Sequence, residues 1–389
     1  MIYLDHNATT PLDEEVRKAI AGSFPLFGNP SSSHAAGAAA KEAVERARQR
    51  VAQLLACDPR EVVFTSGGTE SNNLAIIGTA RKFRGGHIIT SEIEHPSVLN
   101  PVRWLELNGF KATYLPVDAG GRIYPGDLKK AVRKDTVLIT IMHANNETGV
   151  LQPVREIGEI AWEHDIPFHS DAAQSVGKMD VHVPDLRVDM LTVVSHKFYG
   201  PKGIGALYIK GFSGVGHDER VGASSASRVP APIIFGAGHE GGMRPGTENI
   251  LGIAGLGAAC ETAARSLPER YERALKLRDR LFNLLHEELD IRLNGHEALR
   301  LPNTLNISIK GIAAEDLILV VRDRIALSSG SACHSGMRKP SPVLKAMGIS
   351  DEDALASVRL SVGKDNTSQE IDEAAKIIIP SVKGLLRPS

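Results

Sequence analysis

A lysine and an aspartate lie at the ends of two strand-like runs, and together they could hold an aldehyde cofactor. Lys197 follows the apolar run Met190 to Val194 and precedes a turn rich in glycine and proline. Asp171 follows another strand-like run at 167–169. A lysine surrounded by apolar neighbours loses its proton more readily and becomes a nucleophile. A strand-end lysine and a carboxylate for a ring nitrogen are the pair that pyridoxal phosphate (PLP) requires.

Other candidate cofactor contacts occur at similar positions. Gly68 and Thr69 belong to a glycine turn that opens a helix, where free backbone N–H groups and the helix dipole favour a phosphate. His95 could stack on a pyridine ring, and Asn146 and Gln174 lie near further strand ends. Each has an ordinary structural explanation when taken singly: a turn, a cap or a loop side chain. Because ligands of open α/β sheets bind at the carboxyl ends of strands, their joint occurrence favours one cofactor site.

The cysteines and a second lysine separate into reactive and inert candidates. Cys333 lies among small residues, which predicts an accessible backbone, whereas Cys57 and Cys260 lie on apolar helical patterns and are predicted to be buried. Lys202 rivals Lys197, but it lies inside a Gly-Pro-Lys-Gly turn, where we expect it to be solvated. Three cysteines make no disulfide framework. Scattered histidines, with no second ligand pair beside Cys333, do not predict a metal site.

Helix and strand patterns alternate along the chain, which predicts an α/β fold with a mostly parallel sheet covered by helices on both faces. A helix is predicted at 41–56, another from the glycine turn to residue 82, and a long helical region at 268–288. A capping box at Thr367 to Glu370 opens the last helix. Strands are predicted at 61–65, 87–90, 137–142, 167–169, 304–309, 325–328 and 358–362.

The change of pattern near residue 255 predicts two domains. The large PLP-binding domain would span 15–255. Residues 1–14 and 256–389 would form a smaller α/β domain that carries the cysteine segment 328–342. The stretch 211–232, rich in glycine, serine and proline, is predicted to be a mobile loop.

Composition excludes several classes of protein. The 389 residues carry 45 basic and 46 acidic side chains, a formal charge of −1, which does not predict direct nucleic-acid binding or an anionic membrane as partner. No apolar run approaches the roughly 18 residues of a membrane span. The N-terminus lacks the pattern of a signal peptide. With so few cysteines, these features predict a cytoplasmic protein.

The chain resembles the cysteine desulfurases and selenocysteine lyases, PLP-dependent enzymes of the aminotransferase class V family. The resemblance covers nearly the whole length and implies the type I PLP-dependent transferase fold. It rests on long motifs: YLDHNATTP from Tyr3, GNPSSSH, TSGGTESNN, HANNETG, DAAQSVGK, SHKFYGPKG, RPGTEN, SSGSACHSG, and RLSVG ending at Gly363.

The resemblance implies roles around the cofactor ring. Lys197 would hold PLP as a Schiff base and later move the substrate α-proton. Asp171 would keep the ring nitrogen protonated, and His95 would stack on the ring and take part in acid/base steps. Gln174 would bond the phenolate oxygen, with Asn146 beside it and near the substrate.

The phosphate end has one departure from the family pattern. Gly68, Thr69, Ser195 and His196 would hold the phosphate. Many relatives carry a phosphate-binding serine three residues before the lysine, where this chain has Val194. Ser195 is then the expected replacement.

Further residues would complete the site. Thr247 resembles a threonine that reaches the phosphate of the neighbouring subunit, which implies a homodimer. Arg359 would clamp the substrate carboxylate, a task that suits a bidentate guanidinium. Gly241 occupies a position where an arginine is usual.

The implied reaction transfers sulfur from L-cysteine to Cys333 as a persulfide, releases L-alanine and passes the sulfur to an acceptor or scaffold protein. Selenocysteine lyase is the main alternative, because the residues after Cys333 and at 340–344 resemble that version of the loop, and Val194 agrees. A transaminase or a non-catalytic scaffold would have no need of Cys333. Iron–sulfur cluster assembly, tRNA thiolation, DNA sulfur modification and selenium supply share this chemistry, so the site residues do not select the destination.

Overall fold

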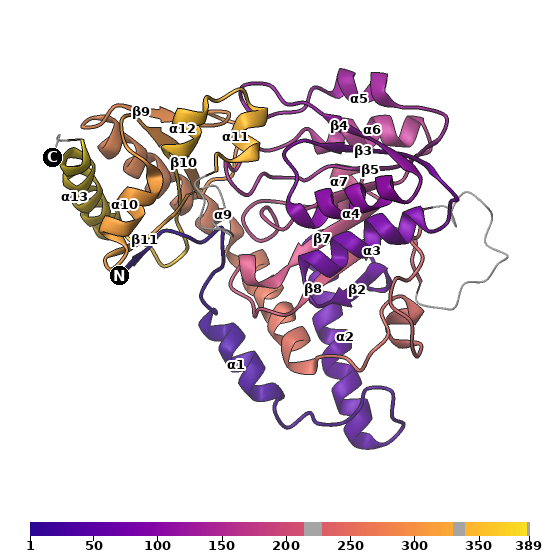
Figure 1. Cartoon of the computed structure of the whole chain (residues 1–389). Helices are drawn as coiled ribbons and strands as arrows, with labels where there is room; N and C mark the ends of the chain where they lie inside the picture. Colours follow the sequence, from indigo (N-terminus) through magenta and orange to yellow (C-terminus); the bar gives the residue numbers. More distant parts are fainter. Residues whose placement is uncertain (214–227, 330–338, 387–389) are drawn as a thin grey trace.

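A seven-stranded sheet forms the centre of the larger part of the molecule (Figure 1). The structure, a computed structural model, describes residues 1–213, 228–329 and 339–386. Neighbouring strands are parallel except at β8, which is antiparallel to both of its neighbours, so the predicted mostly parallel sheet is confirmed. The strand order is β2 (Val62–Thr65), β8 (Gly205–Ile209), β7 (Met190–Val194), β6 (Phe168–Asp171), β5 (Thr136–Thr140), β3 (Gly86–Ser91) and β4 (Phe110–Leu115).

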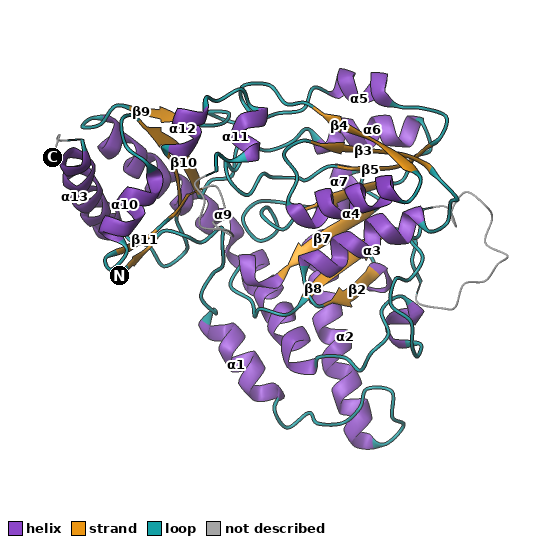
Figure 2. Cartoon of the chain, viewed as in Figure 1, coloured by secondary structure: helices purple, strands orange, loops and turns teal. Residues whose placement is uncertain are grey.

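Helices cover both faces of this sheet (Figure 2). Successive side chains of a strand point to opposite faces, so Ile88 and Leu138 pack in one core and Ile89 and Ile139 in the other. The first core contains α3 (Gly68–Ala80) and α4 (Pro96–Leu107). The second contains residues of α1 (Glu14–Ser23), α2 (Ala35–Leu55), α5 (Pro125–Ala131), α6 (Val154–Glu163), α7 (Val183–Leu186) and α9 (Ile250–His286).

A four-stranded antiparallel sheet organises the smaller part. Its order is β12 (Ser328–Ser329), β13 (Ser357–Ser361), β10 (Thr304–Ile309) and β9 (Ile291–Leu293). Beside it, β1 (Ile2–Tyr3) pairs in parallel with β11 (Ile325–Ala326). The helices here are α10 (Ala314–Val321), α11 (Pro342–Ala346), α12 (Asp351–Leu355) and α13 (Ser368–Leu385).

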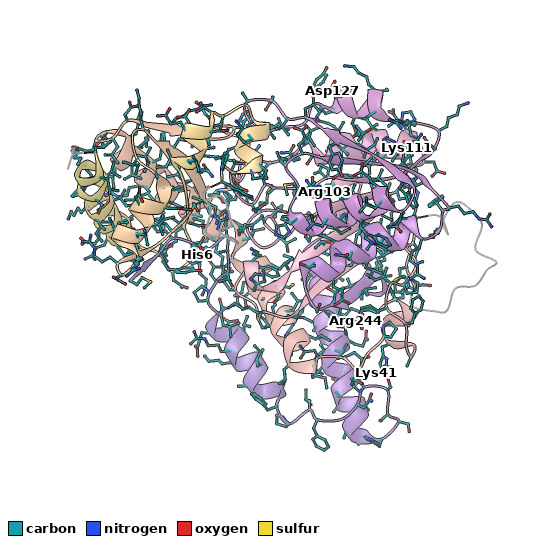
Figure 3. All side chains as sticks on the ribbon, in the orientation of Figure 1. His6, Lys41, Arg103, Lys111, Asp127 and Arg244 are labelled. Carbon is teal, nitrogen blue, oxygen red and sulfur yellow. The ribbon has the colours of Figure 1, made fainter. Side chains whose placement is uncertain are left out.

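The long helix α9 belongs to both parts of the molecule. Ile253 and Leu256, near its start, pack in a core of the larger part, whereas Leu277 and Leu281 pack in the core of the smaller part. The N-terminal segment also connects them: Leu4 is buried in the smaller core, and the chain then passes toward the large sheet (Figure 3, where His6 is labelled). The division at 15–255 and 256–389 stays a prediction.

Several element boundaries differ from expectation. The helix predicted at 41–56 begins at Ala35, because His34 caps it by accepting from the Gly37 N–H, and an alanine-rich start has no apolar periodicity to reveal it. The strand predicted at 325–328 is wrong as one element, since β11 and β12 pair with different strands. The capping box at Thr367 is confirmed.

Three other expectations concern cysteines and loops. Cys260 is buried, but Cys57 is only partly so, because it follows the left-handed end of α2 at Ala56 and lines a surface pocket. Residues 214–227 of the predicted mobile loop and 330–338 of the cysteine segment, including Cys333, lie outside the described residues. Within the described ranges, no helix is long and apolar enough to cross a bilayer, and no cluster of potential ligands could hold a metal ion.

Candidate active site

A cavity of about 370 Å³ lies where strands of the large sheet end. Asp171 is the last residue of β6, and Lys197 follows the neighbouring parallel strand β7 within the short 3₁₀ turn Ser195–Lys197. Parallel strands bring their carboxyl ends to one edge, which is where ligands of such sheets bind. Nine of the predicted site residues line this cavity: Gly68, Thr69, His95, Asn146, Asp171, Gln174, His196, Lys197 and Arg359.

Lys197 is a partly buried amine held against the N-terminal segment. Its Nζ donates to the carbonyl oxygens of Asn7 at 2.6 Å and Ala8 at 2.9 Å. Burial, aided by the positive charge of Arg359, lowers the pKa of Lys197 to about 8, against an opposing effect of Asp171. A pKa this low makes the neutral, nucleophilic amine available near neutral pH. The predicted solvation of Lys202 is confirmed, because that residue is exposed.

The carboxylate of Asp171 is fixed from two sides. Its Oδ2 accepts from Asn72 Nδ2 at 2.7 Å, and its Oδ1 accepts from the Ala173 N–H at 2.9 Å. Asn72 is itself oriented, because its Oδ1 accepts from the Thr192 hydroxyl at 2.7 Å. Only 6% of the Asp171 surface is exposed. A buried carboxylate pinned in this way can bond a protonated ring nitrogen without having to reorient.

His95 presents its ring to the cavity in one tautomer. It caps α4, and its Nδ1 accepts from the Ser97 N–H at 3.1 Å. Because a backbone N–H can only donate, Nδ1 is the unprotonated nitrogen and the hydrogen of the neutral ring lies on Nε2. Burial is the largest cause that lowers the pKa of His95, which favours this neutral form. The ring is therefore an oriented, uncharged surface for stacking.

Arg359 lines the cavity as a largely paired guanidinium. It lies on β13, and its Nη2 bonds Asp5 Oδ1 at 2.8 Å while Nη1 donates to the Asn146 carbonyl at 3.0 Å. Its Nε is buried without a partner among the described residues. A buried guanidinium N–H left unpaired is costly, so the position favours an anionic ligand such as a carboxylate.

The start of α3 forms an anion-binding end to the cavity. No side chain caps this helix, and Gly67 precedes it with φ +146°. A Cβ on Gly68 would meet Val194 Cγ2 at 2.6 Å, so only glycine permits this close approach to β7. The free N–H groups of the first turn and Thr69 then suit a phosphate. An amine, a pinned carboxylate and a phosphate-binding end around one cavity fit PLP.

Two predicted residues do not reach this cavity. Val194 lines it, and Ser195, the next residue, is not among the residues that line it: its hydroxyl is fully buried, has no partner in the part of the chain that the structure describes, and lies close against Gly200. Ser195 therefore does not line the cavity of this structure, and its role as a replacement for the usual serine stays a prediction. Thr247 is exposed and lies outside the cavity of its own chain.

Two other buried polar residues lie in or next to the site, although their types gave no signal: Asn7 lines the cavity, and Glu147 follows Asn146, which lines it. Asn7 is fully buried, its Nδ2 donates to Thr304 Oγ1 at 2.8 Å, and Asn303 donates to its Oδ1 at 3.1 Å. Glu147 accepts from the Ser341 hydroxyl, and burial raises the pKa of Glu147 to about 7. Both residues lie in motifs that we quoted, but their contacts join segments far apart in the sequence.

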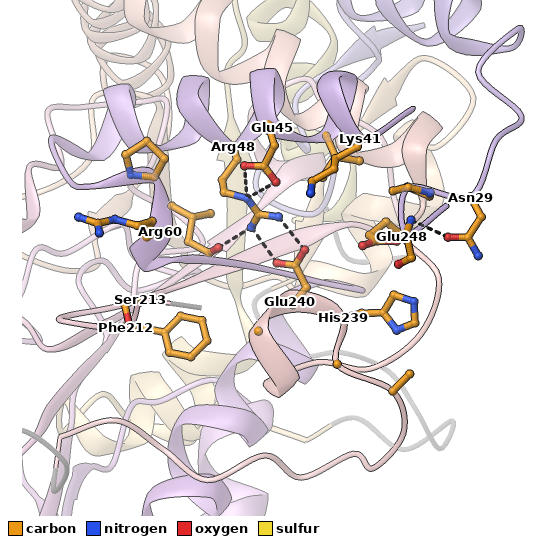
Figure 4. A pocket seen from close by; sticks show the side chains of 18 residues that line it. Asn29, Lys41, Glu45, Arg48, Arg60, Phe212, Ser213, His239, Glu240 and Glu248 are labelled. Atoms are coloured by element: carbon orange, nitrogen blue, oxygen red, sulfur yellow. Dashed lines mark hydrogen bonds and ion pairs between the residues drawn. The ribbon is translucent and has the colours of Figure 1, made fainter. Parts of the chain in front are cut away.

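A larger surface cavity of about 800 Å³ contains none of the predicted site residues (Figure 4). Its wall holds an ion pair in which Arg48 Nη1 and Nη2 bond the two carboxylate oxygens of Glu240, each at 2.8 Å. Glu240 also accepts from the Phe64 N–H at 2.8 Å, and its side chain is only 3% exposed. This pair ties the turn His239–Gly242 to α2 and β2, just before the segment that carries Thr247.

Replacing Glu240 with alanine is expected to lower the free energy of unfolding by about 1–3 kcal/mol, because the Phe64 N–H would lose its acceptor and Arg48 would keep only its bonds to Glu45 and the Val62 carbonyl. Urea unfolding of the two proteins measures the difference. Glu42→Ala is the matched control, since Glu42 forms an exposed pair with Arg46 on the same helix and should change little. Equal losses of unfolding free energy in both variants would show that the pair of Glu240 and Arg48 contributes no more to stability than an exposed ion pair.

The comparisons with known proteins agree with one another. The aminotransferase class-V family model matches residues 2–374. Cysteine desulfurase IscS of Dictyoglomus turgidum is 43% identical over 97% of this chain and 93% of the relative, and the IscS of Methanosarcina thermophila is 44% identical over 99% and 92%. A solved NifS-like protein has a TM-score of 0.89 at 35% identity, covering 98% of this chain and 99% of that one. SspA in complex with cysteine has a TM-score of 0.81 at 38% identity, covering 94% and 100%.

Proposed function

The chain belongs to the aminotransferase class-V family and to its cysteine desulfurase group, and we propose that it removes sulfur from L-cysteine with PLP as cofactor. The cavity around Lys197, Asp171 and Arg359 supports this proposal most directly, because an amine, a ring-nitrogen partner and a carboxylate clamp surround one space. Cysteine-bound SspA, with 38% identity to this chain, is consistent with the substrate.

Each residue has a distinct task in this proposal. When bound, PLP supplies an electron sink for negative charge at the substrate α-carbon. Lys197 holds the cofactor in the resting enzyme, and its freed Nζ takes the α-proton of the substrate. Asp171 bonds the ring nitrogen, and the neutral His95 ring stacks above. Arg359, which lines the cavity, orients the substrate by pairing its guanidinium with the carboxylate.

Sulfur leaves the substrate by transfer to Cys333. The thiolate of Cys333 attacks the substrate sulfur, an S–S bond forms, and the C–S bond breaks. Its electron pair goes to the substrate β-carbon, which takes a proton, and Lys197 returns a proton to the α-carbon, so that L-alanine forms. Cys333 is left as a persulfide that an acceptor protein can take. The assignment of Cys333 comes from the sequence, since that residue lies outside the described ranges.

The proposal is tested by incubating the PLP-loaded protein with L-[³⁵S]cysteine. Alanine and protein-bound label should form in equal amounts in the first turnover. A transaminase would instead transfer the amino group in a reaction that depends on pyruvate, and no ³⁵S label would become bound to the protein. That result would contradict the proposal.

Selenocysteine lyase is the second candidate, favoured by Val194, which lines the cavity where a serine is usual in relatives. A selenolate leaves more readily than a thiolate, so that reaction would depend less on Cys333. The ratio of kcat/KM for L-selenocysteine to that for L-cysteine separates the two functions.

We also propose a homodimer in which Thr247 reaches the phosphate of the neighbouring subunit. The exposure of Thr247, away from its own cavity, is what such a role requires. The mass of the native particle in solution tests the dimer.

We also propose a cytoplasmic location, because a protein with few cysteines and a persulfide-forming thiol suits a reducing compartment.

The low pKa of Lys197 predicts a pH dependence for cofactor uptake. Only the neutral amine attacks an aldehyde, so the rate of PLP attachment to the apo-protein should rise with pH up to about 8 and then level off. The control is a lysine analogue free in solution, whose rate of reaction with PLP should keep rising until the pH reaches the ordinary lysine pKa of 10.5. Absorbance in the visible range follows both reactions. A protein rate that is still rising at about pH 10 would contradict the prediction.

A further inference from the structure

The side-chain amide of Gln174 has only one orientation that its neighbours accept. Gln174 Nε2 donates to the Asn7 carbonyl at 3.0 Å, and Gln174 Oε1 accepts from Lys178 Nζ at 2.8 Å. A backbone carbonyl cannot donate, so a flipped amide would set Gln174 Oε1 against the Asn7 carbonyl oxygen and lose that bond. Nε2 carries two hydrogens, and only one of them has a partner among the described residues. Because Gln174 lines the cofactor cavity, the second N–H is the donor available there.

Lys178 supports this amide from outside the cavity. It lies behind Gln174, four residues along, and lines a separate small cavity rather than the one that holds the candidate cofactor contacts. A second bond from its Nζ to Asn7 Oδ1 at 3.0 Å fixes the lysine in place. The turn that returns the chain here depends on Gly177 at φ +75°, where a Cβ would meet the Phe198 ring.

We propose that Lys178 is a positioning residue that holds the free N–H of Gln174 toward the phenolate oxygen of the cofactor and thereby lowers the pKa of the lysine-bound chromophore. The inference rests on the proposed function, in which Lys197 carries PLP. A hydrogen bond to the anionic oxygen favours the deprotonated form of the chromophore.

Several other ionisable groups bear on the pKa values of Lys178 and Lys197. Burial lowers the pKa of Lys178 well below its ordinary value, and Lys197 and Arg359 add to the effect. Asp171 and Asp5 oppose the lowering at Lys197. His6 and His196, both with a pKa lowered to about 4, stay neutral near pH 7, so neither substitutes for Lys178 there.

The test is a spectrophotometric pH titration of the PLP-loaded protein. Lys178→Met removes the donor at similar size and should raise the apparent pKa of the chromophore by about 0.5–1 unit, the effect of one hydrogen bond. Gln174→Leu should raise it at least as much. The double variant should equal Gln174→Leu alone, since Lys178 acts through Gln174. Lys202→Met, which removes an exposed lysine nearby, is the control and should leave the titration unchanged.

An unchanged titration in Lys178→Met, or shifts that add in the double variant, would overturn the inference. If Lys178→Met does not fold, Lys178→Arg carries the test, because it keeps a donor: a wild-type titration is expected, and a shift as large as that of Gln174→Leu overturns the role. A wild-type protein that forms no lysine-bound chromophore would refute the proposed function itself, which is a separate outcome.

Discussion

Replacing Lys197 with alanine is expected to abolish the lysine-bound chromophore and to reduce alanine formation by at least ~10²–10⁴-fold, the usual contribution of one acid–base group. The amine lies at the cavity edge beside the carboxylate of Asp171, and burial lowers its pKa to about 8, so it can both bind an aldehyde and take a proton. No other described lysine lines that cavity. The phosphate-binding start of α3 is unaffected, so non-covalent PLP binding should persist.

Absorbance and reduction with borohydride, followed by peptide mapping, measure the Lys197 prediction. Lys202→Ala is the matched control, because Lys202 lies five residues along the chain, in the following turn, and is exposed. A reducible PLP adduct that survives in Lys197→Ala and maps to Lys202 or Lys178 would show that the wrong lysine was assigned. Partial rescue by an added small amine would support the proton-transfer role.

Residues at strand ends were predictable because the pattern of the strands places them. Lys197 and Asp171 each follow an apolar run, and parallel neighbouring strands bring both to one edge. The same regularity does not extend to Ser195, because this residue lies in the 3₁₀ turn after β7, where two consecutive residues, His196 and Lys197, both line the cavity. Arg359 was identified only through the family resemblance, since nothing in its local pattern distinguishes it from any strand arginine.

Contacts between distant segments could not be predicted. Asn7 bonds Thr304 and receives a bond from Gln174, residues that lie 297 and 167 positions away. Lys178 has no pattern in the sequence that predicts its bond to Gln174, four residues before it. These residues matter through their partners, and only the packing of the N-terminal segment between the two parts of the molecule determines those partners.

Replacing Cys333 with alanine is expected to abolish protein-bound sulfur and to reduce desulfuration of L-cysteine by several orders of magnitude, because removing a nucleophile leaves only the residual effect of binding. The cavity residues stay in place, so the chromophore and its change on adding L-cysteine should be retained. L-Selenocysteine should still react at a substantial fraction of the wild-type rate, since a selenolate is the better leaving group. The variant therefore separates cofactor chemistry from sulfur transfer.

The control for Cys333 is the pair of other cysteines. Burial raises the pKa of Cys57 to about 12 and raises that of the fully buried Cys260 still more, so neither forms a thiolate near neutral pH. Cys57→Ala and Cys260→Ala should then keep the bound ³⁵S label at the wild-type level. Label that persists in Cys333→Ala and disappears with one of these would assign the persulfide to a different thiol. Loss of selenocysteine and cysteine turnover to the same extent would mean that Cys333 also serves steps before sulfur transfer.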